Sequence, residues 1–314
     1  MRYFGFLSFF LILTINTRAQ TQSNCDCYDR LTNLSRYYEE YGDTESALKA
    51  YSKGLNFKPK AKWSPYEYYR FGELHAIDGD IQSATHYLAE AFRRGFDTSY
   101  FSYEVFDEVR ESQGWHQVAQ NLDSMKREFQ AQINFDYRLA IEDIRGSDQT
   151  IRRLIKVPDS TFRLLDSINY SRLKSLFKQY GYPDMQEHGF EGSQGAYLIL
   201  LHAAMYTQEM YEEILDILNQ AINAYGYKRS DMAQFIDRRE VWHNKREQIF
   251  GTWNAYRADN FSKIRELKAI DEKRMSYNLL RLKEQAIIES RNIPVGYVAS
   301  AYPDNYFCGH TLQD

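Results

Sequence analysis

One histidine of this sequence has surroundings that suit acid–base or ligand-binding chemistry. His202 lies in the apolar stretch of residues 196–205, which predicts a helix that is apolar on all sides and therefore buried. A buried histidine needs partners for both ring nitrogens, and it could act as a general base or as a ligand. The alternative is a core histidine whose hydrogen bonds are satisfied by its neighbours, which is the more common situation.

Six polar residues elsewhere in the second half could join this histidine. They are Asp148, Gln149, Arg152, Asp237, Arg238 and Gln248. The first three lie within one helical turn, so that Asp148 and Arg152 can form a local ion pair. If all six converge on His202, the two aspartates become catalytic candidates, and the arginines and glutamines could bind an anionic ligand. The alternative, which we favour, is a buried network that fixes how the helices pack.

Other kinds of reactive or cofactor site lack their motifs in this sequence. The seven histidines are scattered and none forms a His-x-x-x-His or His-Glu-x-x-His pair, so we predict no metal site. Cys25, Cys27 and Cys308 lie near the chain ends, which argues against a cysteine nucleophile. A Gly-x-Ser-x-Gly elbow, a phosphate loop and the glycine pattern of a dinucleotide fold are missing too, and we expect no cofactor.

The first half carries two tandem helix–turn–helix patterns. Gly42-Asp43 and Gly79-Asp80 each end one helix and start the next. Small residues let paired helices approach closely, and large ones fill the gaps between hairpins. The matched positions are Leu31, Leu34, Ser35, Tyr38, Ala47, Gly54 and Leu55 in the first copy and Tyr68, Phe71, Gly72, His75, Ala84, Leu88 and Ala91 in the second. Residues from about 28 to 130 therefore resemble the tetratricopeptide repeat family, with residues 103–129 as a degenerate third pair that caps the stack.

The resemblance to this family implies an inner face that binds a peptide or a partner protein. The residues expected there are Asp29, Thr32, Arg36, Glu39, Tyr66, Tyr69 and Glu73. Because tyrosine and arginine are favoured at interfaces, the binding candidates are Arg36, Tyr66 and Tyr69. The alternative is that this face packs on the second half of the same chain, which the shallow groove of two hairpins favours.

The second half is also predicted to be helical. Its charged segment, Arg265 to Ser290, is amphipathic and is expected to form a solvated helix or hairpin. Six short motifs follow one another along this half, and their order and spacing are characteristic. They are Asp148-Gln149-x-x-Arg152, Gly181-Tyr182-Pro183, the Gly195 helix with His202, Asp237-Arg238, Gln248-x-Phe250-Gly251-Thr252 and Asp271-Glu272-Lys273-Arg274. On these motifs, residues from about 137 to 290 resemble an uncharacterised bacterial family of exported proteins whose role is unassigned. The family pattern places glutamine before the histidine and aspartate two positions after it, where this chain has Leu201 and Ala204, and this difference argues against an acid–base role.

The N-terminus has the features of a secretory signal peptide. Arg2 supplies the positive charge, and residues 4–15 form an apolar run that is too short for a membrane span. Thr17 and Ala19 are small residues that suit cleavage before Gln20. No later segment of the sequence approaches a membrane span, so we expect a soluble mature chain that is periplasmic or extracellular.

The net charge limits which partners are expected, and the three cysteines limit which disulfides can form. The net charge is −4, and removal of residues 1–19, which hold two arginines and no acid, makes it −6. An acidic chain without a basic stripe argues against nucleic acid binding. In an oxidising compartment Cys25 or Cys27 could pair with Cys308, or all three thiols could stay unpaired, and the sequence leaves these alternatives open.

These observations predict an all-α protein with four segments. They are a signal peptide over residues 1–19, tetratricopeptide-like hairpins over 20–135, a helical domain of unassigned role over 136–291 and an irregular tail over 292–314. We expect an exported module that binds a protein or peptide without catalysis. The alternative is an enzyme or small-ligand binder with a polar site around His202. That alternative gains if His202 and the two arginines line an open pocket, and it loses if they are sealed and hydrogen-bonded to one another.

Overall fold

The computed structural model is helical throughout the part of the chain that it describes. That part comprises residues 4–154, 156–183, 185–224, 227–253 and 263–309, with side chains described from residue 23 onward except at 186, 187 and 190. The first half contains α1 (Phe4–Tyr41), α2 (Thr44–Leu55), η1 (Lys60–Lys62), α3 (Pro65–Ile77), α4 (Ile81–Arg93), η2 (Thr98–Ser102), η3 (Glu104–Phe106), α5 (Asp107–Glu111), α6 (Gln113–Ala119) and α7 (Leu122–Gln132). The second half contains α8 (Phe135–Arg152), α9 (Asp159–Tyr180), α10 (Met185–Ala203), α11 (Gln208–Asn223), α12 (Arg229–Trp242), η4 (Leu267–Ala269), α13 (Ile270–Ser276) and α14 (Leu282–Ile288). Within the described ranges the extended pairing is limited to one isolated bridge, between Gln248 and Ile264, and the predicted all-α class is confirmed.

The helices of the first half start and stop where the sequence predicts. Gly42 and Gly79 have positive φ angles of 85° and 80°, a conformation that glycine adopts at little steric cost. Asp43 and Asp80 then cap α2 and α4, since each carboxylate accepts a hydrogen bond, at 3.0 Å, from the backbone N–H three residues later. The predicted stop and start signals are therefore confirmed.

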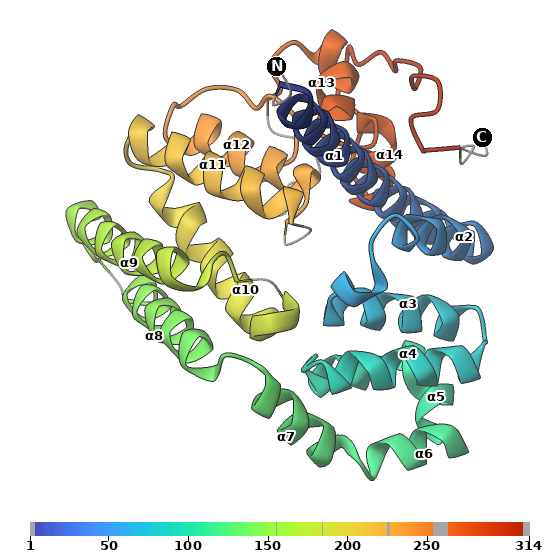
Figure 1. Cartoon of the computed structure of the whole chain (residues 1–314). Coiled ribbons are helices and arrows are strands. Elements are labelled where there is room, and N and C mark those ends of the chain that lie inside the picture. Colours follow the sequence, from blue (N-terminus) through green and yellow to red (C-terminus); the bar gives the residue numbers. More distant parts are fainter. Residues whose placement is uncertain (1–3, 155, 184, 225–226, 254–262, 310–314) are drawn as a thin grey trace.

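The first four helices form two hairpins, α1 with α2 and α3 with α4 (Figure 1). A Cβ atom at Gly72 would lie 2.9 Å from Cγ of Leu88, so glycine at this position allows α3 and α4 to approach closely. Residues 103–129, predicted as a third pair of helices, form η3, α5, α6 and much of α7 instead. Phe106 and Trp115 from this segment still join the core of the hairpins.

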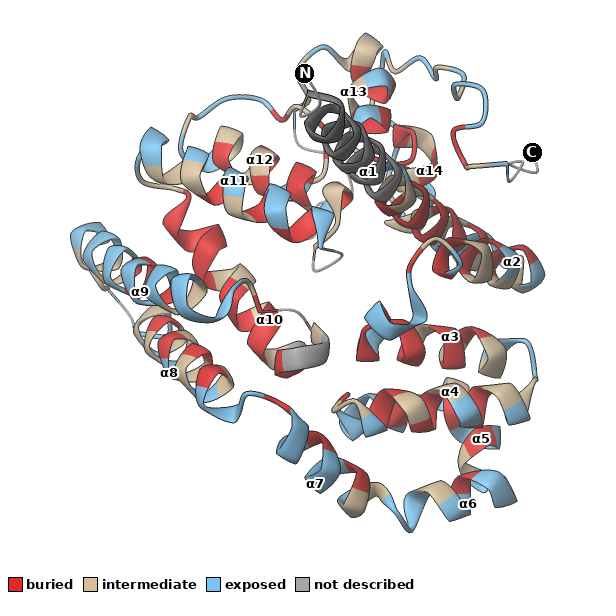
Figure 2. Cartoon of the chain, viewed as in Figure 1, coloured by how far each residue is buried: buried red, intermediate tan, exposed pale blue. Residues whose placement is uncertain are grey.

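Two main apolar cores hold the described part of the chain together. One unites α1 to α6 with residues near the C-terminus, including Met275, Tyr306 and Phe307. The other lies among α8 to α12, where much of α10 is buried against α8 and α9 (Figure 2). Figure 1 shows α13 and α14 beside α1, at the opposite end of the sequence. The first core is therefore built from both ends of the chain.

A disulfide joins the two ends covalently. Cys27 of α1 pairs with Cys308, and Cys25 is a buried thiol outside this disulfide whose Sγ donates to the carbonyl oxygen of Ile222 at 3.4 Å. Among the alternatives that the sequence left open, the structure has the Cys27 pairing.

The charged segment Arg265–Ser290 is not the solvated helix or hairpin that the sequence predicts. It forms η4, α13 and α14, and Arg274 is fully buried. The guanidinium of Arg274 donates to the carbonyl oxygens of Phe250 and Leu280 at 2.5 and 2.6 Å. Asp271 is buried too and accepts hydrogen bonds from later residues of the chain. Asp271 and Arg274 face inward because each has several hydrogen-bond partners.

The N-terminal segment extends beyond what the structure describes. Residues 1–3 of the predicted signal peptide lie outside the described residues, and the remainder falls in the part of α1 whose side chains are not described. Within the described residues, none of the helices combines the length and apolarity needed to cross a membrane.

Candidate functional site

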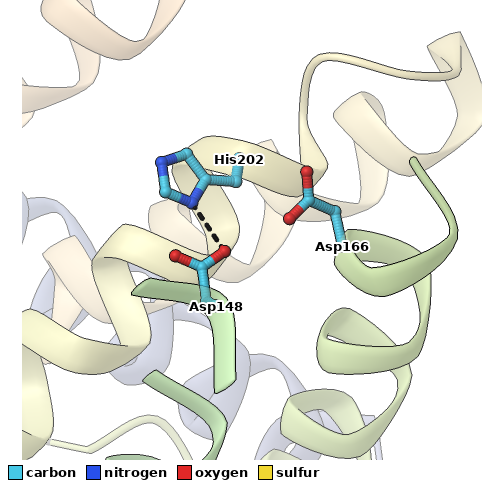
Figure 3. A group of neighbouring side chains, drawn as sticks. All are labelled: Asp148, Asp166 and His202. Carbon is cyan, nitrogen blue, oxygen red and sulfur yellow. Dashed lines mark hydrogen bonds and ion pairs between the residues drawn. The ribbon is translucent and has the colours of Figure 1, made fainter. Parts of the chain in front are cut away.

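The residues around His202 meet where three helices come together. Asp148 lies near the end of α8, Asp166 in the first half of α9 and His202 in the last turn of α10. Nδ1 of His202 lies 3.0 Å from Oδ1 of Asp148, and Asp166 faces the pair from α9 (Figure 3). The predicted neighbourhood of Asp148 and His202 is therefore present in the structure.

Arg152 bridges the two carboxylates of this group. Its Nη2 lies 3.0 Å from Oδ1 of Asp148 and also donates to Oδ1 of Asp166. The hydroxyl of Tyr206 donates to the other oxygen of Asp166, and Nε2 of Gln149 donates to Oδ2 of Asp148 at 2.7 Å. We call these five residues, together with His202, the His202 network. Its carboxylate oxygens all have partners inside the network.

The charges of the His202 network offset one another. Burial raises the pKa of Asp148, but hydrogen bonds from His202 and Arg152 outweigh burial and hold this pKa well below its usual value. Because an ionised carboxylate only accepts hydrogen bonds, we assign to Nδ1 of His202 the hydrogen that it donates to Asp148. Asp148 is fully buried and His202 is 8% exposed. Asp148 and His202 are thus bonded to each other inside the protein, while the side chain of Arg152 is 26% exposed.

The same network contains a set of atoms that metals use. One ligand atom each from Asp148, Asp166 and His202 lie within 4.8 Å of one another. Oxygen and imidazole ligands of this kind suit divalent cations. The guanidinium of Arg152 already binds both carboxylates, however, and a cation would have to displace it. The arrangement is therefore that of an internal ion-pair network.

Asp166 is a member that the sequence analysis missed. A signal was available, because Asp166, Tyr170 and Leu173 recur at helical spacing and all three are buried on α9. A carboxylate on a buried helical face requires a partner for its charge, and Arg152 is the partner here.

Asp237 and Gln248 belong to a second network. Asp237 is fully buried, and its carboxylate accepts hydrogen bonds from the backbone N–H groups of residues 249, 250 and 252 at 2.6, 2.9 and 2.8 Å. The Thr252 hydroxyl donates to the same carboxylate at 2.8 Å. Oε1 of Gln248 accepts from the backbone N–H of Trp253 at 2.7 Å. These bonds fix the loop after α12 rather than reach the His202 network.

The two adjacent arginines of α12, Arg238 and Arg239, have different surroundings. The guanidinium of Arg238, a predicted binding residue, lies 5.1 Å from the ring centroid of Trp253. The adjacent Arg239, which the sequence analysis did not single out, is buried and donates to the carbonyl oxygen of Ala204 and to Oε1 of Gln208. Arg239 thus ties α12 to the end of α10.

The three candidates on the repeat face lie in two kinds of place. Tyr69 is buried, with its ring centroid 4.4 Å from that of Phe96. Arg36 and Tyr66 line a cavity of about 440 Å³ between the two halves of the chain. The repeat face is thus partly buried and partly open to this cavity.

The walls of this cavity come from distant parts of the chain. They are built by α1, the segment between α2 and α3, the start of α3, α10 and the residues from the end of α11 into α12. The described lining residues are Tyr28, Thr32, Asn33, Arg36, Tyr51, Lys58, Lys62, Ser64, Tyr66, Glu67, Arg70, Tyr182, Met185, Ser193, Gln194, Tyr197, Ala224, Tyr227, Lys228, Asp231 and Gln234. Aromatic and polar groups alternate around it, and its volume lies within the range of small-ligand sites. Among these described lining residues there is none from the His202 network.

Asp29 joins the two halves beside this cavity. Its carboxylate accepts hydrogen bonds from the backbone N–H and the hydroxyl of Ser230 at 2.9 and 2.6 Å, so α1 caps the first turn of α12. Nζ of Lys228 donates to Oγ1 of Thr32 at 3.0 Å. Burial raises the pKa of Asp29 to about 6. The charge of Lys228 and the hydrogen bonds from Ser230 oppose this increase in part. Asp231 is exposed to the cavity, and partial desolvation by the surrounding protein raises its pKa as well.

Comparison with known proteins finds a similarity in the second half of the chain. Residues 157–291 match a family described as a family of unknown function, DUF6624. The match supports the predicted resemblance of residues 137–290 to an uncharacterised family. No tetratricopeptide family matches the first half, so that resemblance stays a prediction. No curated protein and no solved structure matches the chain.

Proposed function

We propose that this chain is an exported binding protein without catalytic activity, and that it holds a peptide segment of a partner in the cavity between its two halves. The observation that carries the proposal is the cavity of about 440 Å³, with walls from both halves. Sites of this size bury most of the surface of a small ligand, and a short peptide segment is of that size.

The lining of the cavity suits a peptide. Tyrosines supply flat apolar contact area together with a hydroxyl, and they are among the residues favoured at interfaces. Gln194 and Gln234 carry side-chain amides, each with donors and an acceptor that match the N–H and C=O groups of a peptide backbone.

Export is supported by two independent features. The predicted signal peptide over residues 1–19 directs the chain out of the cytoplasm. The Cys27–Cys308 disulfide suits an oxidising compartment, because cytoplasmic thiols are kept reduced. Both features favour a periplasmic or extracellular protein.

A binding role without catalysis is supported by the His202 network. A general acid or base must reach the proton that it transfers. Asp148 and Asp166 are buried, His202 is 8% exposed, and Arg152 binds both carboxylates, so the polar groups of the network bind mainly to one another. This network stabilises the packing of α8, α9 and α10, which leaves the cavity as the place where a partner binds.

The proposal is tested by blocking the cavity. Mature protein is incubated with pools of N-acetylated random octapeptides, and retained peptides are quantified by mass spectrometry. Gln234 of α12 lines the cavity, whereas Gln220 is an exposed glutamine on α11 outside it. We expect Gln234→Trp to lower retention by about tenfold and Gln220→Trp, the matched control, to leave it unchanged. Equal retention by both variants, or none by the unmodified protein, would show that the cavity does not bind peptides.

A further inference from the structure

Three exposed tyrosines lead away from the cavity along the inner side of the repeats. Tyr66 lines the cavity and is 41% exposed, Tyr100 is 38% exposed and Tyr103 is 53% exposed. The ring of the buried Phe96 connects the first two, with centroids 6.4 Å from Tyr66 and 5.2 Å from Tyr100. The centroids of Tyr100 and Tyr103 are 6.3 Å apart. We call Tyr66, Tyr100 and Tyr103 the tyrosine track.

The tyrosine track rests on a buried floor. Tyr69 stacks on Phe96, and its ring centroid lies 6.1 Å from that of Tyr100 and 6.5 Å from that of Tyr66. Aromatic rings held from below offer contact area at a low cost in conformational entropy. Exposed apolar surface that is contiguous with a cavity marks an interaction site.

The spacing of the rings fits an extended peptide. Neighbouring centroids along the floor and the track lie 5.2 to 6.4 Å apart. In an extended chain, side chains i and i+2 point to the same side and lie roughly 6.5 to 7 Å apart. Alternate side chains of such a peptide can therefore rest on Tyr100 and Tyr103, while the path from Tyr100 to Tyr66 runs over the ring of Phe96.

The cavity end of the site carries positive charge. Of the described lining residues, five are cationic and two are carboxylates. Two of these cations already have carboxylate partners, since Lys58 binds both oxygens of Glu67, at 2.7 and 2.9 Å, and Arg70 binds Glu39 and Glu73. Arg36 of α1 and Lys228 beside α12 stand on the wall with Asp231, from opposite halves of the chain. A carboxylate of the ligand placed between Arg36 and Lys228 would gain charge-assisted hydrogen bonds from both halves.

We propose that the ligand is an extended peptide that places a carboxylate in the cavity, against Lys228 and Arg36, and lays aromatic or proline side chains on the tyrosine track. This inference rests on the proposed function and names its ligand class. The carboxylate can be the C-terminus of the peptide or an Asp or Glu side chain, because both offer the same acceptor atoms.

Three octapeptide pools separate these sources. The acid pool has a free C-terminal carboxylate and no Asp or Glu, the amide pool is the same with an amidated C-terminus, and the side-chain pool is amidated but contains Asp and Glu. A chito-oligosaccharide serves as an uncharged glycan probe. Retention of each probe is measured with the full mature chain and with variants whose thermal unfolding is checked first.

Each part of the proposal has a matched variant. Lys228→Met keeps the aliphatic stem and removes the charge, and Lys126→Met makes the same change at an exposed position of α7. Asp231→Asn removes a lining carboxylate. Tyr103→Ala shortens the track, and Tyr41→Ala is its control at a residue that is 68% exposed.

The expected result is retention of the acid or the side-chain pool about tenfold above the amide pool. Lys228→Met should abolish this preference, Asp231→Asn should strengthen it and Lys126→Met should leave it unchanged. Retained peptides should carry aromatic residues or proline at alternate positions, and Tyr103→Ala should remove that pattern. Equal retention of all three pools would overturn the inference and leave the proposed function standing. Retention of the glycan alone, or of no probe, would overturn both.

Discussion

Removal of the disulfide between Cys27 and Cys308 should cost this protein a large share of its stability. The bridge closes a loop with a sequence separation of 281 residues. In the chain-entropy description a loop of 100 residues is worth roughly 4.7 kcal/mol, and the value grows with the logarithm of length, so about 5 to 6 kcal/mol is the entropic limit here. Measured disulfides usually contribute less, about 2 to 4 kcal/mol, because unfolded chains retain some structure.

Apolar contacts and hydrogen bonds near the disulfide determine how much of the structure stays folded when the disulfide is removed. Tyr306 and Phe307, next to Cys308, are buried in the first core, and the hydroxyl of Tyr306 donates to the carbonyl oxygen of Leu279 at 3.0 Å. The C-terminal segment therefore keeps its apolar contacts and should stay folded. We expect a loss of about 4 kcal/mol in the free energy of unfolding and a decrease of roughly 10 °C in Tm.

The assay compares three forms of the mature chain by urea and thermal unfolding, with and without dithiothreitol. The double variant Cys27→Ser with Cys308→Ser should be less stable than the unmodified protein and insensitive to the reductant. Cys25→Ser, the matched control at the cysteine outside the disulfide, should keep the sensitivity to reductant. The reasoning is refuted if Cys25→Ser abolishes that sensitivity, or if the double variant unfolds at the same urea concentration as the unmodified protein.

Three further substitutions test the networks between helices. Because the pKa of Asp29, about 6, lies above its usual 3.8, the folded state binds more protons than the unfolded state between those values. The free energy of unfolding should therefore fall by up to about 3 kcal/mol as the pH rises from about 4 to 6.5. In urea unfolding curves measured across this pH range, Asp29→Asn should remove most of the pH dependence. An unchanged pH dependence would contradict the raised pKa of Asp29. Asp237→Ala should lower the free energy of unfolding by about 3 kcal/mol, since several buried N–H groups lose their acceptor. Amide hydrogen exchange should become faster in the loop of residues 249–252. Continued protection of these amides would show that Asp237 does not hold the loop. Arg152→Met leaves Asp148 and Asp166 buried without their cation and should lower the free energy of unfolding by about 3 to 5 kcal/mol at pH 7. Part of this loss should be recovered at low pH, where the carboxylates become protonated. A loss of stability that does not depend on pH would argue against the ion pairs.

Features set by short stretches of chain could be predicted from the sequence. The turns at Gly42-Asp43 and Gly79-Asp80 depend on a glycine with positive φ and on an aspartate three residues before the N–H that it caps. The ion pair of Asp148 with Arg152 depends on a spacing of four residues within one helix. These interactions are local, so helical periodicity and capping chemistry are sufficient to find them.

Features that join distant segments could not be predicted in this way. A charged helix face predicts exposure, yet Arg274 is fully buried because Phe250, in the loop after α12, supplies a carbonyl oxygen. Asp166 is buried because Arg152 reaches it from α8. The cavity depends on how α1 and α3 meet α10 and α12, and no sequence pattern within either half encodes that meeting.

The position of the matched region, residues 157–291, indicates which part of the chain determines binding specificity. Within residues 157–291, Asp237, Gln248 and Arg274 use their hydrogen-bonding atoms on neighbouring backbone, and they stabilise the fold. The cavity takes about half of its described lining from α1 to α3, outside that region. A chain with the matched domain but without these hairpins would keep its networks and lose half of the cavity. Binding in this protein should therefore depend on the junction between its halves rather than on the residues that define the domain.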